Sequence, residues 1–220
     1  MTTGEDGTDP PAADQEAPTM EYLVTMTTLV PDGTAEATVD EVRAREAAHS
    51  RELAARGHLL RLWRPPLQPG EWRTLGLFAA GDAGELEQVL ASMPLRVWRT
   101  DVVTALAPHP NDPGLPQAAA GPGQAEFLTT FTRAVPPGTP AEAVRDAEAA
   151  EARQAAELGR QGHLVRLWQV PSQGYALGQW VAADPAELQA LLKSLPLAPY
   201  LTVGTTPLTP HPTDPAAAAT

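Results

Sequence analysis

The phrase GHLLRLW at residues 57–63 returns as GHLVRLW at residues 162–168, each time with an arginine inside an otherwise apolar run. When the chain is shifted by the 105 residues that separate the two phrases, 20 of the 45 residues in 21–65 are identical to their counterparts. Past the tryptophans the offset falls to 102, and LAPHPNDP (106–113) then matches LTPHPTDP (208–215). Agreement over this length indicates an internal duplication.

The duplication divides the 220 residues into five segments. The expected segments are a disordered leader rich in proline and acidic residues (1–19), a first repeat (20–113), a flexible linker (114–124), a second repeat (125–215) and a short tail (216–220). Two repeats are too few for a solenoid. We therefore expect two similar domains that pack against each other as an internal dimer.

The overall composition excludes several classes of function. The formal net charge of -12 argues against nucleic acid or an anionic membrane surface as a partner. The absence of cysteine excludes disulfides and thiolate chemistry. No run approaches the roughly 18 apolar residues of a membrane span, and the N-terminus lacks the basic start and apolar core of a signal peptide. These features predict a soluble, cytoplasmic protein.

Both repeats show the same order of secondary structure. The elements expected in the first repeat are a strand (21–30), a helix (35–56), two strands (58–64 and 73–80), a helix (82–92) and a strand (97–106). The later elements of the second repeat are a strand (175–183), a helix (184–194) and a strand (200–208). Gly57 and Gly162 are expected to end the long helices. Thr139 is expected to cap the second long helix, with Pro140 at its first position and Glu142 completing a capping box.

The order βαββαβ is that of the ferredoxin-like plait, an α+β fold. The helices of this fold cover one face of the sheet, so the other face needs a cover. The sheet of the second repeat can supply it. We expect two ferredoxin-like plaits packed through their sheets as an intramolecular pseudo-dimer, the arrangement known as a dimeric α+β barrel.

Each long helix places a glutamate in the apolar stripe that faces the sheet. Glu46 lies between Val42 and Leu53 at helical spacing, and Glu151 holds the same place in the second repeat. Burial raises the pKa of a carboxylate, which suits proton transfer near neutral pH. The alternative is a structural glutamate that pairs with a nearby arginine.

The repeated arginines, Arg61 and Arg166, are the obvious partners. Strict strand alternation places Arg61 on one face with Leu59 and Trp63. A guanidinium in such surroundings needs a carboxylate, which comes either from a substrate or from the helix glutamate. Periodicity leaves both roles open.

Other polar side chains give weaker indications. His58 and His163 begin strands, and the two histidines of the PHP motifs, His109 and His211, either order the tail of each repeat or close the mouth of a pocket. No metal-binding spacing, GxGxxG motif or P-loop is present, so we expect neither a metal nor an organic cofactor.

Residues 42–64 and 86–110 resemble the muconolactone delta-isomerase family. The second repeat is similar to the same family through 149–168 and 188–212, and LPLAPY (195–200) is especially similar. The resemblance implies ferredoxin-like subunits that pair through their sheets and assemble into a ring of dimers. Each chain then stands in for one dimer, and a homo-oligomer of such chains is expected.

The resemblance also implies a reaction, of the kind found in aromatic compound catabolism. A base removes a proton beside the ring oxygen of a butenolide, and a proton returns two carbons away, without a cofactor. The family's helix glutamate falls on Glu46 and Glu151, which are the expected catalytic residues. The side chains expected to bind the anionic substrate are Arg61, Arg166, His49, His58, His163, Trp63 and Trp168.

The chain departs from the family at several of these positions. His58 and His163 replace a lysine, Arg61 and Arg166 replace a histidine, and His49 replaces a tyrosine. These changes point to a related lactone or cyclic substrate and to one of the two sites being structural. Two alternatives stay open: a non-catalytic small-molecule-binding or assembly module, and a cyclase of a specialised, polyketide-like pathway.

Overall fold

The computed structural model of the chain describes residues 19–219, so the expected leader lies outside the described residues except for its last position. The elements of the first repeat are β1 (Met20–Thr28), α1 (Glu36–Ala55), β2 (Leu59–Arg64), β3 (Arg73–Ala80), α2 (Ala83–Ser92), the 3-10 helix η1 (Pro94–Trp98) and β4 (Arg99–Pro108). The elements of the second repeat are β5 (Ala125–Arg133), α3 (Ala141–Arg160), β6 (Leu164–Val170), β7 (Tyr175–Ala182), α4 (Pro185–Lys193), η2 (Ala198–Tyr200), β8 (Leu201–Pro210) and η3 (Pro215–Ala219). The predicted βαββαβ order is confirmed twice.

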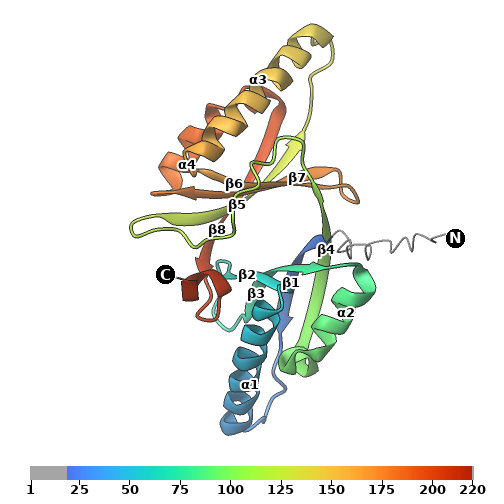
Figure 1. Ribbon diagram of the computed structural model, residues 1–220, viewed down its shortest axis with the longest axis vertical. Helices are drawn as coiled ribbons and strands as arrows, with labels where there is room; N and C mark the ends of the chain where they lie inside the picture. Colours follow the sequence, from blue (N-terminus) through green and yellow to red (C-terminus); the bar gives the residue numbers. More distant parts are fainter. Residues whose placement is uncertain (1–18, 220) are drawn as a thin grey trace, which may run out of the picture.

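The eight strands form one closed antiparallel barrel in the order β1-β3-β2-β8-β5-β7-β6-β4. Two short seams join the repeats, because β8 pairs with β2 through Trp63 and Pro210, and β4 pairs with β6 through Pro108 and Trp168. Figure 1 shows α1 and α2 at one end of the long axis and α3 and α4 at the other, with the barrel between them. The expected fold, a dimeric α+β barrel within one chain, is confirmed.

The buried side chains form three hydrophobic clusters. Two of them lie between the helices and the sheet of each repeat, and they include Leu53 with Phe78 in the first repeat and Leu158 with Trp180 in the second. The third cluster fills the barrel and contains the tryptophan of each repeated phrase. Strands β3 and β7 are therefore buried on both faces along most of their length, which explains their apolar runs, whereas β4 and β8 keep much of their length exposed.

The glycines of the repeated phrases end the long helices, as the sequence predicts. Gly57 has φ of 78°, a left-handed conformation that costs a glycine little. Its N–H donates to Ala54 O, and the N–H of His58 donates to Leu53 O at 2.9 Å, which is a Schellman motif. The predicted cap at Thr139 is wrong, because Pro140 is the N-cap of α3 and the Thr139 hydroxyl bonds the Pro136 carbonyl instead.

A β-bulge interrupts the strand of each repeated phrase. Leu59 opposes Phe78 while Arg61 opposes Leu77, so β2 has one residue more than β3 at this point. Leu59 therefore packs in the helix-facing cluster, whereas Trp63 lies in the barrel. The strict alternation expected from the sequence is wrong for Leu59, and β6 carries the same bulge.

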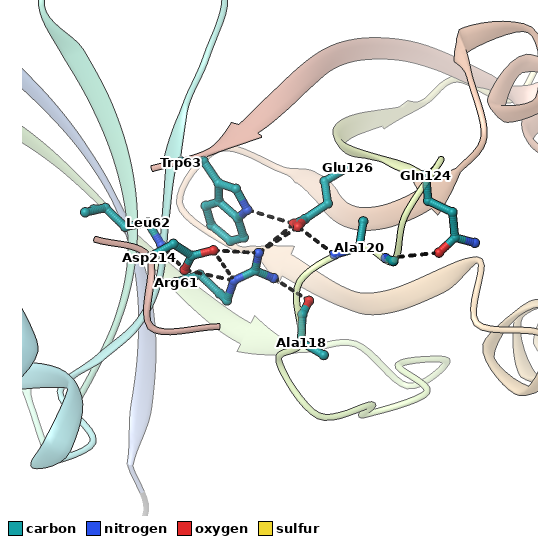
Figure 2. A network of polar contacts seen from close by, with 9 residues as sticks. Arg61, Leu62, Trp63, Ala118, Ala120, Gln124, Glu126 and Asp214 are labelled. Carbon is teal, nitrogen blue, oxygen red and sulfur yellow. Dashed lines mark hydrogen bonds and ion pairs between the residues drawn. The ribbon is translucent and has the colours of Figure 1, made fainter. Parts of the chain in front are cut away.

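Arg61 is buried where the first repeat meets the second (Figure 2). Its Nη2 donates to Glu126 Oε1 at 2.7 Å and to Asp214 Oδ2 at 2.9 Å. Glu126 belongs to β5 and also accepts the indole N–H of Trp63, while Asp214 follows β8 and accepts the backbone N–H of Leu62. A carboxylate pair from the second repeat thus holds both the side chain of Arg61 and the strand next to it.

The same arrangement recurs with the repeats exchanged. Arg166 Nη2 donates to Glu21 Oε2 at 2.6 Å, and its Nε donates to Asp112 Oδ2 at 3.1 Å. Glu21 also accepts the indole N–H of Trp168 at 2.6 Å. We call these two clusters the Arg61 lock and the Arg166 lock. Each ties one repeat to the first strand and to the tail of the other, which explains why the phrase with its arginine is present twice.

The connection between the repeats, residues 114–124, contains no helix or strand but is fixed at several points. The Ala118 carbonyl accepts Arg61 Nη1 at 2.8 Å, and the Ala120 N–H donates to Glu126 at 3.1 Å (Figure 2). These two hydrogen bonds connect the linker to the Arg61 lock, and the flexibility predicted from its composition stays a prediction.

Replacing Arg61 with methionine should destabilise the chain by about 3–5 kcal/mol, since two buried carboxylates lose their shared cation. Arg166→Met should cost less, because the side chains of the Arg166 lock keep some contact with water. Urea unfolding followed by tryptophan fluorescence measures both free energies. Equal losses for the two variants, or losses below about 1 kcal/mol, would contradict this assignment.

Candidate active site

Each repeat holds a cavity between its long helix and the outer face of its sheet. The cavity in the second repeat contains Glu151 and has a volume of about 330 Å³, and the cavity in the first repeat contains Glu46 and has a volume of about 210 Å³. We call them the Glu151 cavity and the Glu46 cavity. Both predicted glutamates therefore face a space that a small molecule can enter.

Glu151 projects from α3 into mostly apolar surroundings. Its Oε2 accepts the backbone N–H of Leu197 at 2.9 Å, and within residues 19–219 no ion pair joins this carboxylate to a cation. Burial raises the pKa of Glu151, and the hydrogen bond from Leu197 opposes part of that effect. The carboxylate is thus anchored at one oxygen and suited to exchange a proton at the other.

Glu46 has the same backbone anchor but a different electrostatic partner. Its Oε2 accepts the Leu95 N–H at 2.8 Å, and its Oε1 lies 3.1 Å from Arg99 Nη1. Arg99 also binds Asp101, with 2.7 Å between Nε and Oδ1. The pKa of Glu46 is raised overall, because the effect of burial outweighs the lowering by the Leu95 N–H and Arg99. The ion pair that the sequence left open as an alternative exists here, with Arg99 instead of Arg61.

Each cavity also receives a histidine from the opposite repeat. His109 follows β4 of the first repeat and lines the Glu151 cavity, while His211 follows β8 of the second repeat and lines the Glu46 cavity. Burial lowers the pKa of both rings, and for His211 the nearby Arg64 helps to lower the pKa to about 4. Neither cavity is complete without residues from both repeats.

The two cavities differ in charge. Three arginines line the Glu46 cavity, and their counterparts in the second repeat are an acid, an amide and an apolar residue: Arg43 corresponds to Glu148, Arg64 to Gln169 and Arg99 to Leu201. The Glu151 cavity is lined by one arginine, Arg133, which pairs with Glu148 at 2.7 Å. The Glu46 cavity is thus small and cationic, and the Glu151 cavity is larger and mainly apolar.

None of the seven side chains predicted to bind substrate lines either cavity. Arg61 and Arg166 are held in the locks, and Trp63 and Trp168 fill the barrel. The remaining three residues are histidines with protein partners: His58 Nδ1 lies 3.1 Å from the Ala79 carbonyl, His163 Nδ1 lies 3.0 Å from the Val181 carbonyl, and His49 lies between Glu52 and Ser92. The structure thus places these seven side chains outside both cavities, and their contact with a substrate stays a prediction that the cavity linings do not support.

The residues that do line the cavities gave little signal in the sequence. Arg99 and Arg133 are not repeated, since Leu201 and Thr28 occupy the equivalent positions. His109 and His211 were found through the repeated PHP motif, but the sequence does not reveal that each enters the cavity of the other repeat.

Residues 19–219 contain no group of three or more histidine, aspartate or glutamate side chains arranged to hold a metal ion. The described helices likewise include none that is long and apolar enough to cross a membrane.

Comparison with known proteins shows that the sequence of each repeat matches one protein family. The family model described as "Muconolactone delta-isomerase" matches residues 20–112 and 125–214. A muconolactone delta-isomerase of Cupriavidus pinatubonensis is 34% identical over 92 residues, which cover 42% of this chain and 97% of the relative. Muconolactone delta-isomerase 1 of Acinetobacter lwoffii is 32% identical over 92 residues, covering 42% of this chain and 93% of that protein.

Solved structures with a similar fold come from other proteins. A heme-binding protein from Thermus thermophilus has a TM-score of 0.54 at 13% identity, covering 92% of this chain and 97% of that one. A mutant chlorite dismutase from Candidatus Nitrospira defluvii has a TM-score of 0.53 at 12% identity, covering 87% of this chain and 92% of that one. At such low identity the likeness concerns the fold alone.

Replacing Glu151 with glutamine should stabilise the chain at pH 8. The raised pKa means that the folded chain binds this proton more tightly than the unfolded chain, so stability falls as the pH rises from about 4.5 through the raised pKa. Glutamine stays neutral and keeps an oxygen for the Leu197 N–H. We expect a higher urea midpoint than that of the unmodified chain at pH 8 and the same midpoint at pH 4.

Glu157→Gln provides the control, because Glu157 lies on the same helix outside the cavity and pairs with Arg160. For this control, the difference in urea midpoint from the unmodified chain should be the same at pH 4 and at pH 8. A Glu151→Gln variant that is less stable than the unmodified chain at pH 8 would show that the carboxylate stabilises the fold.

Proposed function

The chain belongs to the muconolactone delta-isomerase family, and on that premise we propose that it is a cofactor-independent isomerase. Its reaction shifts a carbon–carbon double bond within a small anionic lactone or a related cyclic substrate, with Glu151 and Glu46 as the groups that move the proton. The observation that carries the proposal is the half-buried carboxylate in each cavity, at the helix position where the family resemblance places its glutamate.

The Glu151 cavity has the features that proton abstraction from carbon requires. The carboxylate removes a proton from the ring carbon beside the ring oxygen, and the electron pair moves through the double bond onto the carbonyl oxygen. The carboxyl group then returns a proton two carbons away, so that atoms and charge balance over the cycle. The raised pKa of Glu151 brings its proton affinity closer to neutral pH, where a general acid–base group is most effective.

The substrate's acid side chain needs a cation at the cavity. Arg133 lines the Glu151 cavity and pairs with Glu148. The exposed fraction of the side chain is 42% for Arg133 and 44% for Glu148. An exposed pair of this kind contributes little stability, so a substrate carboxylate can compete with Glu148 for the guanidinium. Arg133 is thus the proposed anchor for the substrate.

The two sites should not contribute equally. Arg99 is 3.1 Å from Glu46 and favours its ionised form, which makes Glu46 a weaker base than an unpaired buried carboxylate. The Glu46 cavity is also the smaller of the two. Glu151 should therefore carry most of the turnover.

The setting of the enzyme is also part of the proposal. We place it in the cytoplasm, in the catabolism of aromatic compounds, as two catalytic repeats (20–113 and 125–215) in each chain. Assembly of several chains into a homo-oligomer would follow the pattern that the family resemblance implies.

In the Glu46→Gln background, where the second site is inactive, Glu151→Gln should lower kcat about 10²–10⁴-fold, because the amide cannot accept the substrate proton. Muconolactone is the first probe, and its conversion in D₂O can be followed by NMR through deuterium uptake at the substrate carbons. Glu46→Gln should cause a smaller loss, and the control Glu157→Gln should leave kcat unchanged.

The same measurement separates the alternatives. Turnover unaffected by Glu151→Gln and Glu46→Gln together would refute acid–base catalysis by these residues. Failure of every butenolide acid to bind or react would favour a binding or assembly module, and product formation without deuterium uptake would favour a cyclase.

A further inference from the structure

The turn after the last strand of each repeat places one histidine in the cavity of the other repeat. The N–H of Asp112 donates to the carbonyl of His109 at 2.9 Å, and the N–H of Asp214 donates to the carbonyl of His211 at 2.8 Å. The side chain of Asp112 is held in turn by Arg166, and that of Asp214 by Arg61. The locks between the repeats therefore also fix the position of these histidines.

The same turns determine which ring nitrogen carries the proton. The backbone N–H of Asn111 donates to His109 Nδ1 at 3.1 Å, and the backbone N–H of Thr213 donates to His211 Nδ1 at 3.2 Å. A backbone N–H has no acceptor role, so Nδ1 must present its lone pair, to which the Thr213 hydroxyl, 2.9 Å from His211 Nδ1, then also donates. A neutral imidazole in this state has its proton on Nε2, and an imidazolium would have a proton on both nitrogens. The turn thus selects the neutral ring with an Nε2–H donor.

Nε2 is free to serve a ligand. Among residues 19–219, no protein acceptor is hydrogen-bonded to Nε2 of His109 or of His211, and both rings line cavities that contain a glutamate. The lowered pKa of each ring agrees with a neutral state at neutral pH. A neutral donor is compatible with a nearby base, because it does not neutralise the carboxylate that must accept a proton.

We propose that His109 donates a hydrogen bond from Nε2 to the carbonyl oxygen of the lactone while Glu151 removes the ring proton, and that His211 has the same role opposite Glu46. This inference rests on the proposed function. Negative charge develops on the carbonyl oxygen as the proton leaves carbon, and a fixed donor stabilises that charge. The histidine transfers no proton, so the proton balance of the reaction remains with the glutamate.

The proposal gives the tandem arrangement a catalytic consequence. A single repeat contains the glutamate of its cavity but lacks the histidine, which arrives across a seam of the barrel. Both the base and the donor are brought together only when the two repeats are locked.

Two variants of the full chain test the donor. In the Glu46→Gln background, where turnover comes from the Glu151 cavity, His109→Phe removes the donor and should lower kcat about 10²–10³-fold, with little change in KM for muconolactone. His109→Gln keeps a side-chain N–H and should lose less. Glu157→Gln should show unchanged kcat, and urea unfolding confirms that each variant is folded.

A spectroscopic readout tests the tautomer independently of turnover. In ¹⁵N–¹H NMR spectra of the unmodified chain at pH 7, His109 and His211 should both show the neutral Nε2–H form. When muconolactone saturates the Glu151→Gln variant, the Nε2–H signal of His109 should shift. An Nδ1–H tautomer, a cationic ring, or an unmoved signal at saturation would overturn the inference.

The outcomes distinguish the two proposals. Loss of turnover in Glu151→Gln with full kcat in His109→Phe would overturn the role of the histidine and leave the isomerase intact. Absence of turnover by the unmodified chain with every lactone probe would overturn both. If His109→Phe does not fold, His109→Gln and the NMR titration still decide.

Discussion

Two arginines, the fully buried Arg61 and the partly buried Arg166, pair with carboxylates of the opposite repeat, and these pairs hold the two repeats together. A buried guanidinium is tolerated only when it is paired and hydrogen-bonded, and each of these finds its partners in the first strand and in the tail of the other repeat. The locks hold the two seams of the barrel, and they fix the turns that carry His109 and His211. The arginine in the repeated phrase is thus structural, and it acts on the site through the backbone that it positions.

Duplication has produced two cavities with one backbone plan and two electrostatic environments. Leu95 and Leu197 supply the same backbone N–H to the glutamates, yet Arg99 faces Glu46 while Leu201 takes its place beside Glu151. Burial raises the pKa of both carboxylates, and the change from Arg99 to Leu201 removes the cation that opposes this rise at Glu46. In a fused chain each cavity can change without altering the other, which is impossible in a symmetric dimer of identical subunits.

Local signals in the sequence were sufficient for the fold and for the glutamates. The βαββαβ order, the helix-ending glycines and the stripe position of Glu46 all depend on neighbours within one element, so periodicity predicts them. The partners of Arg61 lie 65 and 153 residues away, beyond what periodicity can reach. The bulge after Leu59 also interrupts the alternation of the strand, so Leu59 does not lie on the same face as Arg61 and Trp63, as strict alternation predicted. The positions of His109 and His211 could not be predicted from the sequence, because each histidine enters the cavity of the other repeat and this depends on how the two repeats close the barrel.

The pH dependence of kcat/KM in the Glu46→Gln variant reports on Glu151, since Glu151 is then the remaining base. We expect an acidic limb whose apparent pKa lies above 4.5, the ordinary value for a glutamate, because burial favours the protonated form of Glu151. The Glu46→Gln/Glu151→Gln double variant should lose the activity, and with it the acidic limb. An acidic limb at or below the ordinary value, or one that survives in the double variant, would contradict the account.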